Sequence, residues 1–491
     1  MALKKYCTVF ALLLMSGAQA SGPSPAHAET LQEAVNQMIT THPDVRAAAH
    51  NRLARDEEVR QARSGYFPTL DLEAGTGKDY VYEPFNGNTS PQEARIGLRQ
   101  NIFAGFSTVN EVDRQKARVQ SQANIVRSTA DNTALKATNV YLEVLKNQAI
   151  VELAKENLTL HQRIADQIKL RSESGVDRLA DMDQIQSRLN LALANVVVAE
   201  QGLLDAQANY DAVIGSPASQ LTRPDNPSPL LPVSREEAER MAVANHPQLK
   251  SAMADLEARN KQDEVAKSPF MPLLDLEADR VWQRDILSDY YNGYDKQEDL
   301  RIFLRLRYNL FNGWKDEARK SETAHLINEA REIKNNTYRQ VVESVRLSWQ
   351  AHEALQKRIN YLRQRLQFAA STANAYTKQW NIGQRTLLDV LDAEAERIDS
   401  ARQLVTAEHD SLYADYRVLN SIGRLIPSLN LRWPEEGAVD DRAAGASSES
   451  ESSAPGKPAQ TTSRTGAGAT TVSTSSTTGS SSMRLSPLTM K

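Results

Sequence analysis

The chain has 491 residues and a formal net charge of −4 at pH 7, from 58 Lys and Arg against 62 Asp and Glu. This length allows two or three ordinary domains, each with its own core. The slightly acidic balance argues against a nucleic-acid partner, which would require a basic surface.

The N-terminus has the pattern of a secretory signal peptide. Two lysines precede an apolar run from Tyr6 to Met15, and two small-x-small cleavage patterns follow. We assign residues 1–28 to the signal, with cleavage after residue 20 as the alternative. The only cysteine, Cys7, is removed with this segment, so the sequence predicts no disulfide and no lipid-bearing cysteine. After Met15 no apolar run approaches the ~20 residues of a membrane helix, so a membrane-spanning part would consist of strands.

One structural unit occurs twice in the chain. Leu70–Ala74 recurs letter for letter 204 positions later, and Asn101–Gly105 matches Asn309–Gly313 at an offset of 208. Both copies also begin with a hydroxyl-x-x-Glu helix-start pattern that is followed by His-Pro. We therefore predict two structural repeats, residues 29–223 and 234–433.

Two stretches in each repeat alternate apolar and polar residues, the period of β-strands with one apolar face. In the first repeat they run from Leu70 to Thr76 and from Ile96 to Ile102, and in the second from Leu274 to Trp282 and from Ile302 to Leu310. The polar faces of the second pair carry opposite charges, which we expect to form ion pairs across the sheet. The acids are Asp275, Glu277 and Asp279, and the bases are Arg301, Arg305 and Arg307.

Aromatic residues gather near the ends of these strands, including Phe67, Phe106, Phe311 and Trp314. An apolar band with aromatic flanks is typical of outer-membrane barrels, although alternation alone also fits a soluble sheet with one solvated face. The export signal and the duplicated hairpin favour the barrel. Four strands cannot close a barrel that needs at least about eight, so we expect the chain to oligomerise, and three chains would supply twelve strands.

Long proline-free intervals follow each hairpin and are rich in good helix formers, with apolar residues at helical spacing. We predict helices over residues 107–172, 178–214, 314–380 and 386–422. At ~1.5 Å per residue the two longer helices approach ~100 Å, far beyond the helices of ordinary globular domains. Beyond Trp433 the composition shifts to Ser, Thr, Gly, Ala and Pro, so we predict that residues 434–491 are a disordered tail.

Catalytic and metal-binding patterns are absent from the sequence. His352-Glu353 opens a zinc-protease string, but Gln356 stands where the second histidine ligand belongs. No phosphate-binding loop, nucleophile elbow or ligand cluster is present. We predict that the protein is not an enzyme and has no cofactor or metal.

Two aspartates three residues apart, Asp389 and Asp392, follow the turn between the last two predicted helices and share a helix face. If several chains met around an axis, this face would form a ring of carboxylates, and such rings set cation selectivity in pores. Alternatively, acids in the first turns of a helix simply interact with its dipole. The residues alone leave both interpretations open.

The duplicated unit and the turn Gly383-Gln-Arg385-Thr-Leu-Leu-Asp389-Val-Leu-Asp392-Ala together resemble the TolC family of outer-membrane channel-tunnels, over about residues 29–433. The resemblance implies an α+β membrane protein, a trimeric channel-tunnel. Its 12-stranded β-barrel, with four strands from each chain, would be continuous with a long α-helical periplasmic barrel. The implied location is the outer membrane of a Gram-negative bacterium, extending into the periplasm. The implied partners are outer-membrane lipid, a periplasmic adaptor and an inner-membrane ABC transporter.

The resemblance also assigns functions to three sets of residues. They are the pore constriction, Asp389 and Asp392; the entrance latch, Arg385, Asp181 and Trp380; and the adaptor-docking tips, Gly175 and Gly383. Trp380 departs from the family pattern, because the best-known member has a tyrosine there and an indole lacks the phenol hydroxyl. Gln184 takes the first-repeat position of Asp392, so the acidic pair is expected in one repeat only.

Within the family, the missing lipid-bearing cysteine favours type I secretion. The trimer would be a passive conduit for a secreted protein and would open when the adaptor and the ABC transporter dock. The alternative is the outer-membrane duct of a multidrug efflux pump. A further alternative, outside the family, is a soluble periplasmic coiled-coil scaffold.

Overall fold

The computed structural model describes residues 28–82, 87–173, 179–285 and 296–438. All of them belong to one unit of the chain. The predicted signal, except for residue 28, and the predicted tail beyond residue 438 lie outside the described residues.

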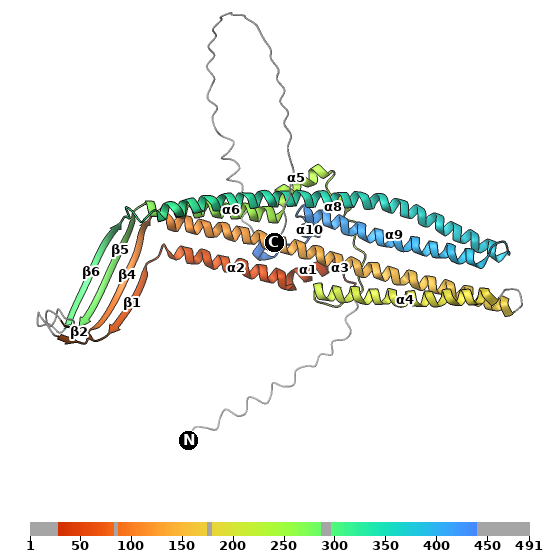
Figure 1. Cartoon of the computed structure of the whole chain (residues 1–491), viewed down its shortest axis with the longest axis horizontal. Coiled ribbons are helices and arrows are strands. Elements are labelled where there is room, and N and C mark those ends of the chain that lie inside the picture. The colour runs from red at the N-terminus through yellow and green to blue at the C-terminus, as the bar shows by residue number, and fades with distance from the viewer. Residues whose placement is uncertain (1–27, 83–86, 174–178, 286–295, 439–491) are drawn as a thin grey trace, which may run out of the picture. The chain divides into compact units, whose positions relative to one another are not determined.

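The two repeats contain the same long elements in the same order (Figure 1). The first contains α1 (Leu31–Thr41), α2 (Pro43–Ser64), β1 (Thr69–Thr76), β4 (Gln92–Ala104), α3 (Ser107–Glu173) and α4 (Leu179–Ile214). The second contains α5 (Arg235–Asn245), α6 (Pro247–Ala266), β5 (Leu273–Arg284), β6 (Lys296–Arg307), α8 (Lys315–Asn381) and α9 (Leu387–Ser421). This order confirms the tandem duplication.

Short elements lie between and after the long ones. They are β2 (Asp79–Val81) and β3 (Gly87–Thr89), which pair with each other, η1 (Ser228–Leu230), η2 (Ser268–Phe270), α10 (Leu425–Ser428) and η3 (Glu435–Gly437). The longest helices, α3 and α8, have 67 residues each. At ~1.5 Å per residue this corresponds to ~100 Å, as the sequence predicted.

Helix caps fix the start of each repeat. The Thr30 side chain accepts a hydrogen bond from the Glu33 N–H, and the Glu33 carboxylate accepts one from the Thr30 N–H at 2.8 Å, which completes a capping box at α1. The histidine of each His-Pro pair then caps the next helix. The Asp44 N–H donates to Nδ1 of His42 at 3.2 Å, and His246 caps α6 in the same way at 3.3 Å. Burial lowers the pKa of His246 to about 4, so its imidazole stays neutral and can accept this bond.

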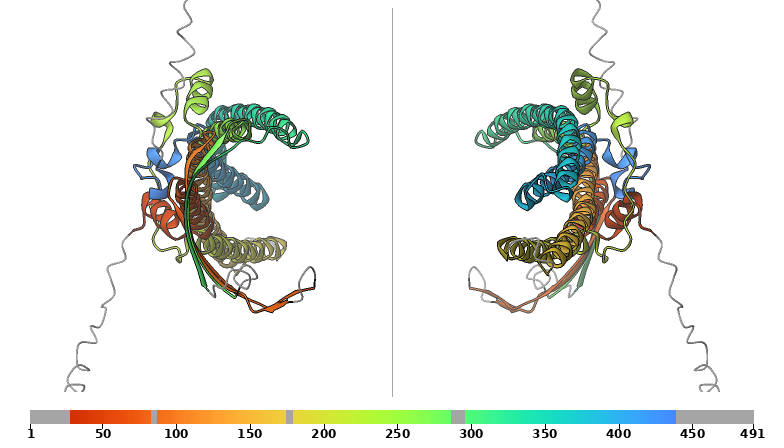
Figure 2. Two further views of the ribbon diagram at one scale, coloured as in Figure 1. Left: turned by 90° about the vertical axis from the view of Figure 1, so that its left-hand side faces the viewer. Right: turned by 90° about the vertical axis from the view of Figure 1, so that its right-hand side faces the viewer.

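The long helices lie side by side in a curved layer, which Figure 2 shows end on. Next to the strands the order across the layer is α8, α6, α3 and α2, and further along it is α8, α9, α3 and α4. One margin of the layer is therefore α8, and the other is α2 followed by α4. None of the described helices combines the length and apolarity needed to cross a bilayer.

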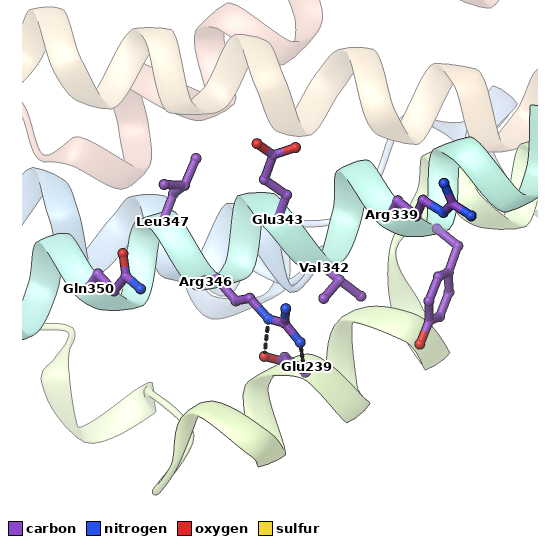
Figure 3. Close-up of a pocket in the computed structure, with 8 residues that line it drawn as sticks. Glu239, Arg339, Val342, Glu343, Arg346, Leu347 and Gln350 are labelled. Atoms are coloured by element: carbon purple, nitrogen blue, oxygen red, sulfur yellow. Dashed lines mark hydrogen bonds and ion pairs between the residues drawn. The ribbon is translucent and has the colours of Figure 1, made fainter. Parts of the chain in front are cut away.

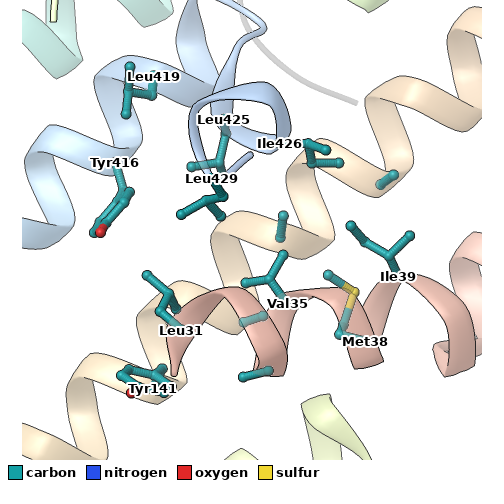
Figure 4. Packing of buried hydrophobic residues seen from close by; sticks show 14 of the residues in the cluster. Leu31, Val35, Met38, Ile39, Tyr141, Tyr416, Leu419, Leu425, Ile426 and Leu429 are labelled. Carbon is teal, nitrogen blue, oxygen red and sulfur yellow. The ribbon is translucent and has the colours of Figure 1, made fainter. Parts of the chain in front are cut away.

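The main apolar core lies where the short helices pack on the middle of this layer (Figure 4). It contains Leu31 of α1, Tyr141 of α3, Leu419 of α9 and Ile426 of α10, all buried. The Tyr141 hydroxyl accepts a hydrogen bond from the Thr222 N–H at 3.0 Å. Because α1 belongs to the first repeat and α9 to the second, their packing on α3 joins the two repeats.

Four strands form one antiparallel sheet in the order β1-β4-β5-β6. The pairing of β4 with β5 joins the two hairpins and leaves β1 and β6 as edges. The predicted strands are confirmed with one correction: β6 ends at Arg307, so Tyr308 and Leu310 lie beyond it. There the Asn309 side chain accepts a hydrogen bond from the Phe311 N–H at 3.0 Å, and such local turns compete with strand pairing.

The two faces of this sheet differ in chemistry. One carries ion pairs between neighbouring strands. The predicted pairing of β5 with β6 is confirmed for Arg305, which lies 2.7 Å from Glu277, and for Arg307, which pairs with Asp275. It is wrong for Arg301, which pairs with Asp299 of its own strand, while Asp279 pairs with Arg95 of β4 at 2.8 Å. The other presents leucine and isoleucine side chains to the surroundings, with Leu70 and Leu304 exposed by 70% and 64%. None of the apolar side chains that the structure describes in these four strands is buried.

Candidate channel constriction at the helix tips

The candidate site is the turn between α8 and α9, at the end of the long helices away from the sheet (Figure 1). Gly383 ends α8 with a φ of +78°, a left-handed conformation that strains other residues. The Gly383 N–H donates to the Trp380 carbonyl and the Gln384 N–H to the Gln379 carbonyl, both at 2.9 Å, the paired bonds of a Schellman motif. Gly175, the predicted tip of the first repeat, lies outside the described residues.

Asp389 is the third residue of α9 and completes a capping box with Thr386, the N-cap residue. Its carboxylate accepts hydrogen bonds from the Thr386 hydroxyl at 2.8 Å and the Thr386 N–H at 3.3 Å, and the Asp389 N–H donates back to the hydroxyl. The Arg385 guanidinium lies 3.8 Å from the same carboxylate. The bonds from Thr386 lower the pKa of Asp389 below its ordinary value. The group is therefore ionised at neutral pH, and its side chain is still 38% exposed.

Asp392, one turn further along α9, has its partner on the other helical hairpin. Its Oδ1 accepts a hydrogen bond from Nη2 of Arg188 in α4 at 3.0 Å. Nothing in the local sequence indicates Arg188, because the two residues are 204 positions apart. The Asp392 side chain is 60% exposed, so solvent reaches the carboxylate beside this ion pair.

Arg385 is held by the end of α8. Its guanidinium stacks on Tyr376, 4.1 Å from the ring centroid, and its Nε donates to Oε1 of Gln379 at 3.1 Å. Asp181 lies in the first turn of α4, and its side chain forms no hydrogen bond or ion pair with the described residues. A single chain therefore does not bring Arg385 and Asp181 together, and the latch between them stays a prediction for an assembly of chains.

Trp380, the third predicted latch residue, lies in an apolar cluster that joins the two helical hairpins. Its side chain is 6% exposed and packs among Ile168 of α3, Ile185 of α4 and Leu391 of α9. The Arg171 guanidinium lies 5.3 Å from the centroid of the indole. The indole thus contributes packing and a cation–π contact at this position.

A hollow of about 490 Å³ lies elsewhere, between α5 and α8 (Figure 3). The Arg346 guanidinium donates to both oxygens of Glu239 there, at 2.8 and 3.2 Å, and the bond from Arg346 lowers the pKa of Glu239. Two charged side chains that line the hollow, Arg346 and Glu239, therefore already neutralise each other. Within the part of the chain that the structure describes, no three potential metal ligands come together.

A family model described as outer membrane efflux protein matches residues 34–216 and 240–424. Outer membrane efflux protein BepC of Brucella suis biovar 1 is 26% identical over 426 residues, which cover 85% of this chain and 90% of that protein. Outer membrane protein TolC of Escherichia coli is 24% identical over 447 residues (86% and 87%). Alkaline protease secretion protein AprF of Pseudomonas aeruginosa is 22% identical over 324 residues (65% and 67%). The crystal structure of outer membrane protein VceC of Vibrio cholerae aligns with a TM-score of 0.67 at 18% identity, over 80% of this chain and 96% of that chain.

These matches confirm the resemblance to the TolC family. The structural similarity shows the fold, an α+β channel-tunnel with a tandem repeat. The family consists of outer-membrane channel proteins, so this protein is a channel and not an enzyme, and it lies in the outer membrane and extends into the periplasm. Because the two matched segments span most of the sequence, the chain belongs to the outer membrane efflux protein family.

Proposed function

We propose that three copies of this chain form the channel-tunnel of a type I secretion system, a passive conduit for a secreted protein across the periplasm and the outer membrane. The observation that carries the trimeric conduit is the four-stranded sheet, whose apolar face is exposed and whose edge strands lack partners in the described chain. The exposed face requires lipid, and the edges require further strands. If β1 of one chain pairs with β6 of the next, a head-to-tail ring of three chains closes with twelve strands.

The margins of the helical layer support the same assembly. α4 exposes Leu191 and Val198, which are seven residues apart, and α8 exposes Tyr361 and Phe368 at the same spacing. Apolar side chains with this repeat are typical of a coiled-coil seam. Because α4 and α8 lie at opposite margins of the layer (Figure 2), the seam of one chain would meet the other seam of its neighbour.

In this trimer the helix tips surround the axis. Asp389 and Asp392 from three chains would form the pore constriction, and Arg385 and Asp181 the entrance latch. The tips at Gly175 and Gly383 would receive a periplasmic adaptor, with an inner-membrane ABC transporter beneath it. Docking of these partners would break the latch, let α8 and α9 swing outward and widen the entrance. No bond in the cargo is made or broken.

The cargo distinguishes two functions within the family. The printed name of AprF, alkaline protease secretion protein, supports protein export. The family description and the name of BepC refer to efflux, so the outer-membrane duct of a multidrug efflux pump is the second candidate. The soluble periplasmic scaffold loses its support, because the chain belongs to a family of outer-membrane proteins.

Deletion of the gene separates the two candidates. For type I secretion, quantitative mass spectrometry of the culture medium should show the loss of one or a few proteins, while susceptibility to antibiotics and detergents stays at the wild-type level. Complementation with the wild-type gene should restore them. Raised susceptibility with an unchanged set of secreted proteins would contradict protein export and support efflux.

The constriction is tested in planar bilayers with the full-length protein purified in detergent. The wild type should give a small, cation-preferring conductance under a KCl gradient. Substituting both aspartates, Asp389→Asn and Asp392→Asn, should shift the reversal potential toward zero, because the ring loses its fixed negative charge. Asp410→Asn, which removes a carboxylate near the other end of α9, is the control. If the double variant and the control gave the wild-type reversal potential, the ring assignment would be wrong.

A further inference from the structure

We propose that Arg188 and Asp392 form a charge lock within each chain. Resting on the proposed channel function, this lock would regulate the same constriction in two ways. It holds α9 beside α4 while the entrance is closed. When it breaks, it adds one unpaired carboxylate per chain to the channel, so opening changes the charge of the constriction as well as its width.

Arg188 and Asp392 connect the two helical hairpins close to their tips. α3 packs against both α4 and α9, and the Arg188 side chain joins these two helices with Nη2 at 3.0 Å from Oδ1 of Asp392. The hairpins share a second ion pair further from the tips, Arg397–Glu156 at 3.1 Å. Only the Arg188 pair uses a carboxylate of the proposed constriction.

The ion pair lies beside the apolar contact that must separate if the hairpins move apart. Ile185, one turn before Arg188, and Leu391, next to Asp392, are both fully buried in the cluster around Trp380. An outward movement of α9 would open this contact and pull the carboxylate away from the guanidinium. Because both charged side chains are partly exposed, the pair contributes only modestly to closure. Its larger effect is on the charge that ions meet at the constriction.

Asp389 provides the contrast within the same helix. Its partners, Thr386 and Arg385, belong to the start of α9 and the turn before it, so they move together with Asp389. Asp392 loses its partner as soon as the hairpins separate. The constriction therefore has one carboxylate that keeps its hydrogen bonds to Thr386 within α9 and one whose ion pair depends on closure. We expect the open channel to prefer cations more strongly than the closed one.

Single-channel recording of the full-length protein tests the lock. Arg188→Gln leaves Asp392 in place but unpaired, so the reversal potential under a KCl gradient should shift toward that of a purely cation-selective pore. Conductance should rise by about twofold or more, because closure is weakened and the constriction attracts more cations. The shift should be large at 0.01 M salt and small at 1 M, because the Debye length falls from ~30 Å to ~3 Å.

The matched control is Arg163→Gln. Arg163 is an exposed arginine of α3, about as many residues from the tip as Arg188, and it forms no ion pair with the described residues. This variant loses the same positive charge without freeing Asp392 and should behave like the wild type. If Arg163→Gln and Arg188→Gln shifted the reversal potential equally, the lock would be refuted, since a general loss of positive charge would explain both.

A charge swap keeps the test informative if one single variant fails to fold. Arg188→Asp alone places two acids together and should raise conductance, and adding Asp392→Arg should return it toward the wild-type level. A double variant as conductive as Arg188→Asp would overturn the lock. Wild-type protein that forms no channel would overturn the proposed function and the lock together, whereas wild-type channels with unaffected Arg188 variants would overturn the lock alone.

Discussion

Asp131 is a carboxyl group enclosed by α3, α9 and α10, with only 3% of the residue exposed. It accepts hydrogen bonds from the Ile426 N–H at 3.2 Å and from Nδ2 of Asn420 at 3.1 Å. Burial raises the pKa of Asp131 to about 7, and these two bonds offset that effect only in part. The folded chain therefore binds a proton at Asp131 over a pH range in which the unfolded chain has already released it.

We expect Asp131 to make the protein less stable as the pH rises from about 4 to about 7. The folded pKa lies above the unfolded one, so folding favours the protonated form and its contribution is lost as the pH rises through the folded pKa. The loss is at most about 1.4 kcal/mol per pH unit in this window. Asp131→Asn removes the titration. The thermal midpoint of the variant, minus that of the wild type, should therefore increase between pH 5 and pH 8 in detergent.

An equal difference between variant and wild type at both pH values would show that Asp131 does not titrate in this range.

Residue-level features of this kind differ in how far the sequence predicts them. The Thr386-x-x-Asp389 cap is local and follows a known pattern. The environments of Asp131 and Arg188 depend on segments hundreds of positions away, such as Ile426 and Asp392, and no spacing rule identifies them.

At the scale of the elements, the two repeats end their last long helix with the same Ile-Gly pair in different surroundings. Gly215 follows α4 with a φ of +85°, and a Cβ there would meet only Oγ1 of Thr41, at 4.0 Å. Gly423 follows α9 with a φ of +70°, and a Cβ there would lie 2.9 Å from Cδ of Pro247 and 3.0 Å from Cα of His246. Both glycines supply the left-handed turn, but only Gly423 also allows the start of α6 to approach closely.

We therefore expect Gly423→Ala to destabilise the protein much more than Gly215→Ala. Alanine at either position costs about 1 kcal/mol of backbone strain. At Gly423 the methyl group must also displace Pro247 and His246, for which overpacking adds about 1–3 kcal/mol. Denaturant midpoints of the two variants in detergent give the comparison. Equal losses would mean that the contact with α6 relaxes freely.

Periodicity predicted the long elements because their period persists over many turns. The helix expected over residues 107–172 is α3, Ser107–Glu173, and the one expected over 178–214 is α4, Leu179–Ile214. The pair β2–β3 was not predicted, because strands of three residues are too short to show a period. The predicted end of β6 was wrong because the apolar alternation continues through Leu310, whereas the turn at Asn309 has already ended the pairing of β6 with β5.

At the scale of the whole molecule, the apolar surface that a single chain leaves exposed marks where other copies and lipid belong. The sheet exposes one apolar face, and the helical layer exposes a seam at each margin. Val198 at the α4 margin is exposed in the single chain. In the proposed trimer it would be buried against α8 of the neighbour.

Val198→Asp should therefore weaken the trimer, because a carboxylate would be buried without a partner at the seam. The measurement is the mass of the purified protein in detergent by light scattering, with the wild type expected at three chains. Asn195→Asp, an exposed position one turn earlier on α4, adds the same charge without removing an apolar side chain and should leave the trimer intact. A trimeric Val198→Asp protein would place the contact between chains elsewhere.

The exposed apolar face of the sheet has a consequence for the order of folding. The helical part has its own core around Tyr141, so it can become stable while the chain is still in water. None of the described apolar residues of the four-stranded sheet is buried. Only lipid and neighbouring copies can shield these side chains from water. We expect a newly exported chain to form its helices first and its sheet last, at the membrane. Until then, the strand segments would need protection from aggregation during their passage through the periplasm.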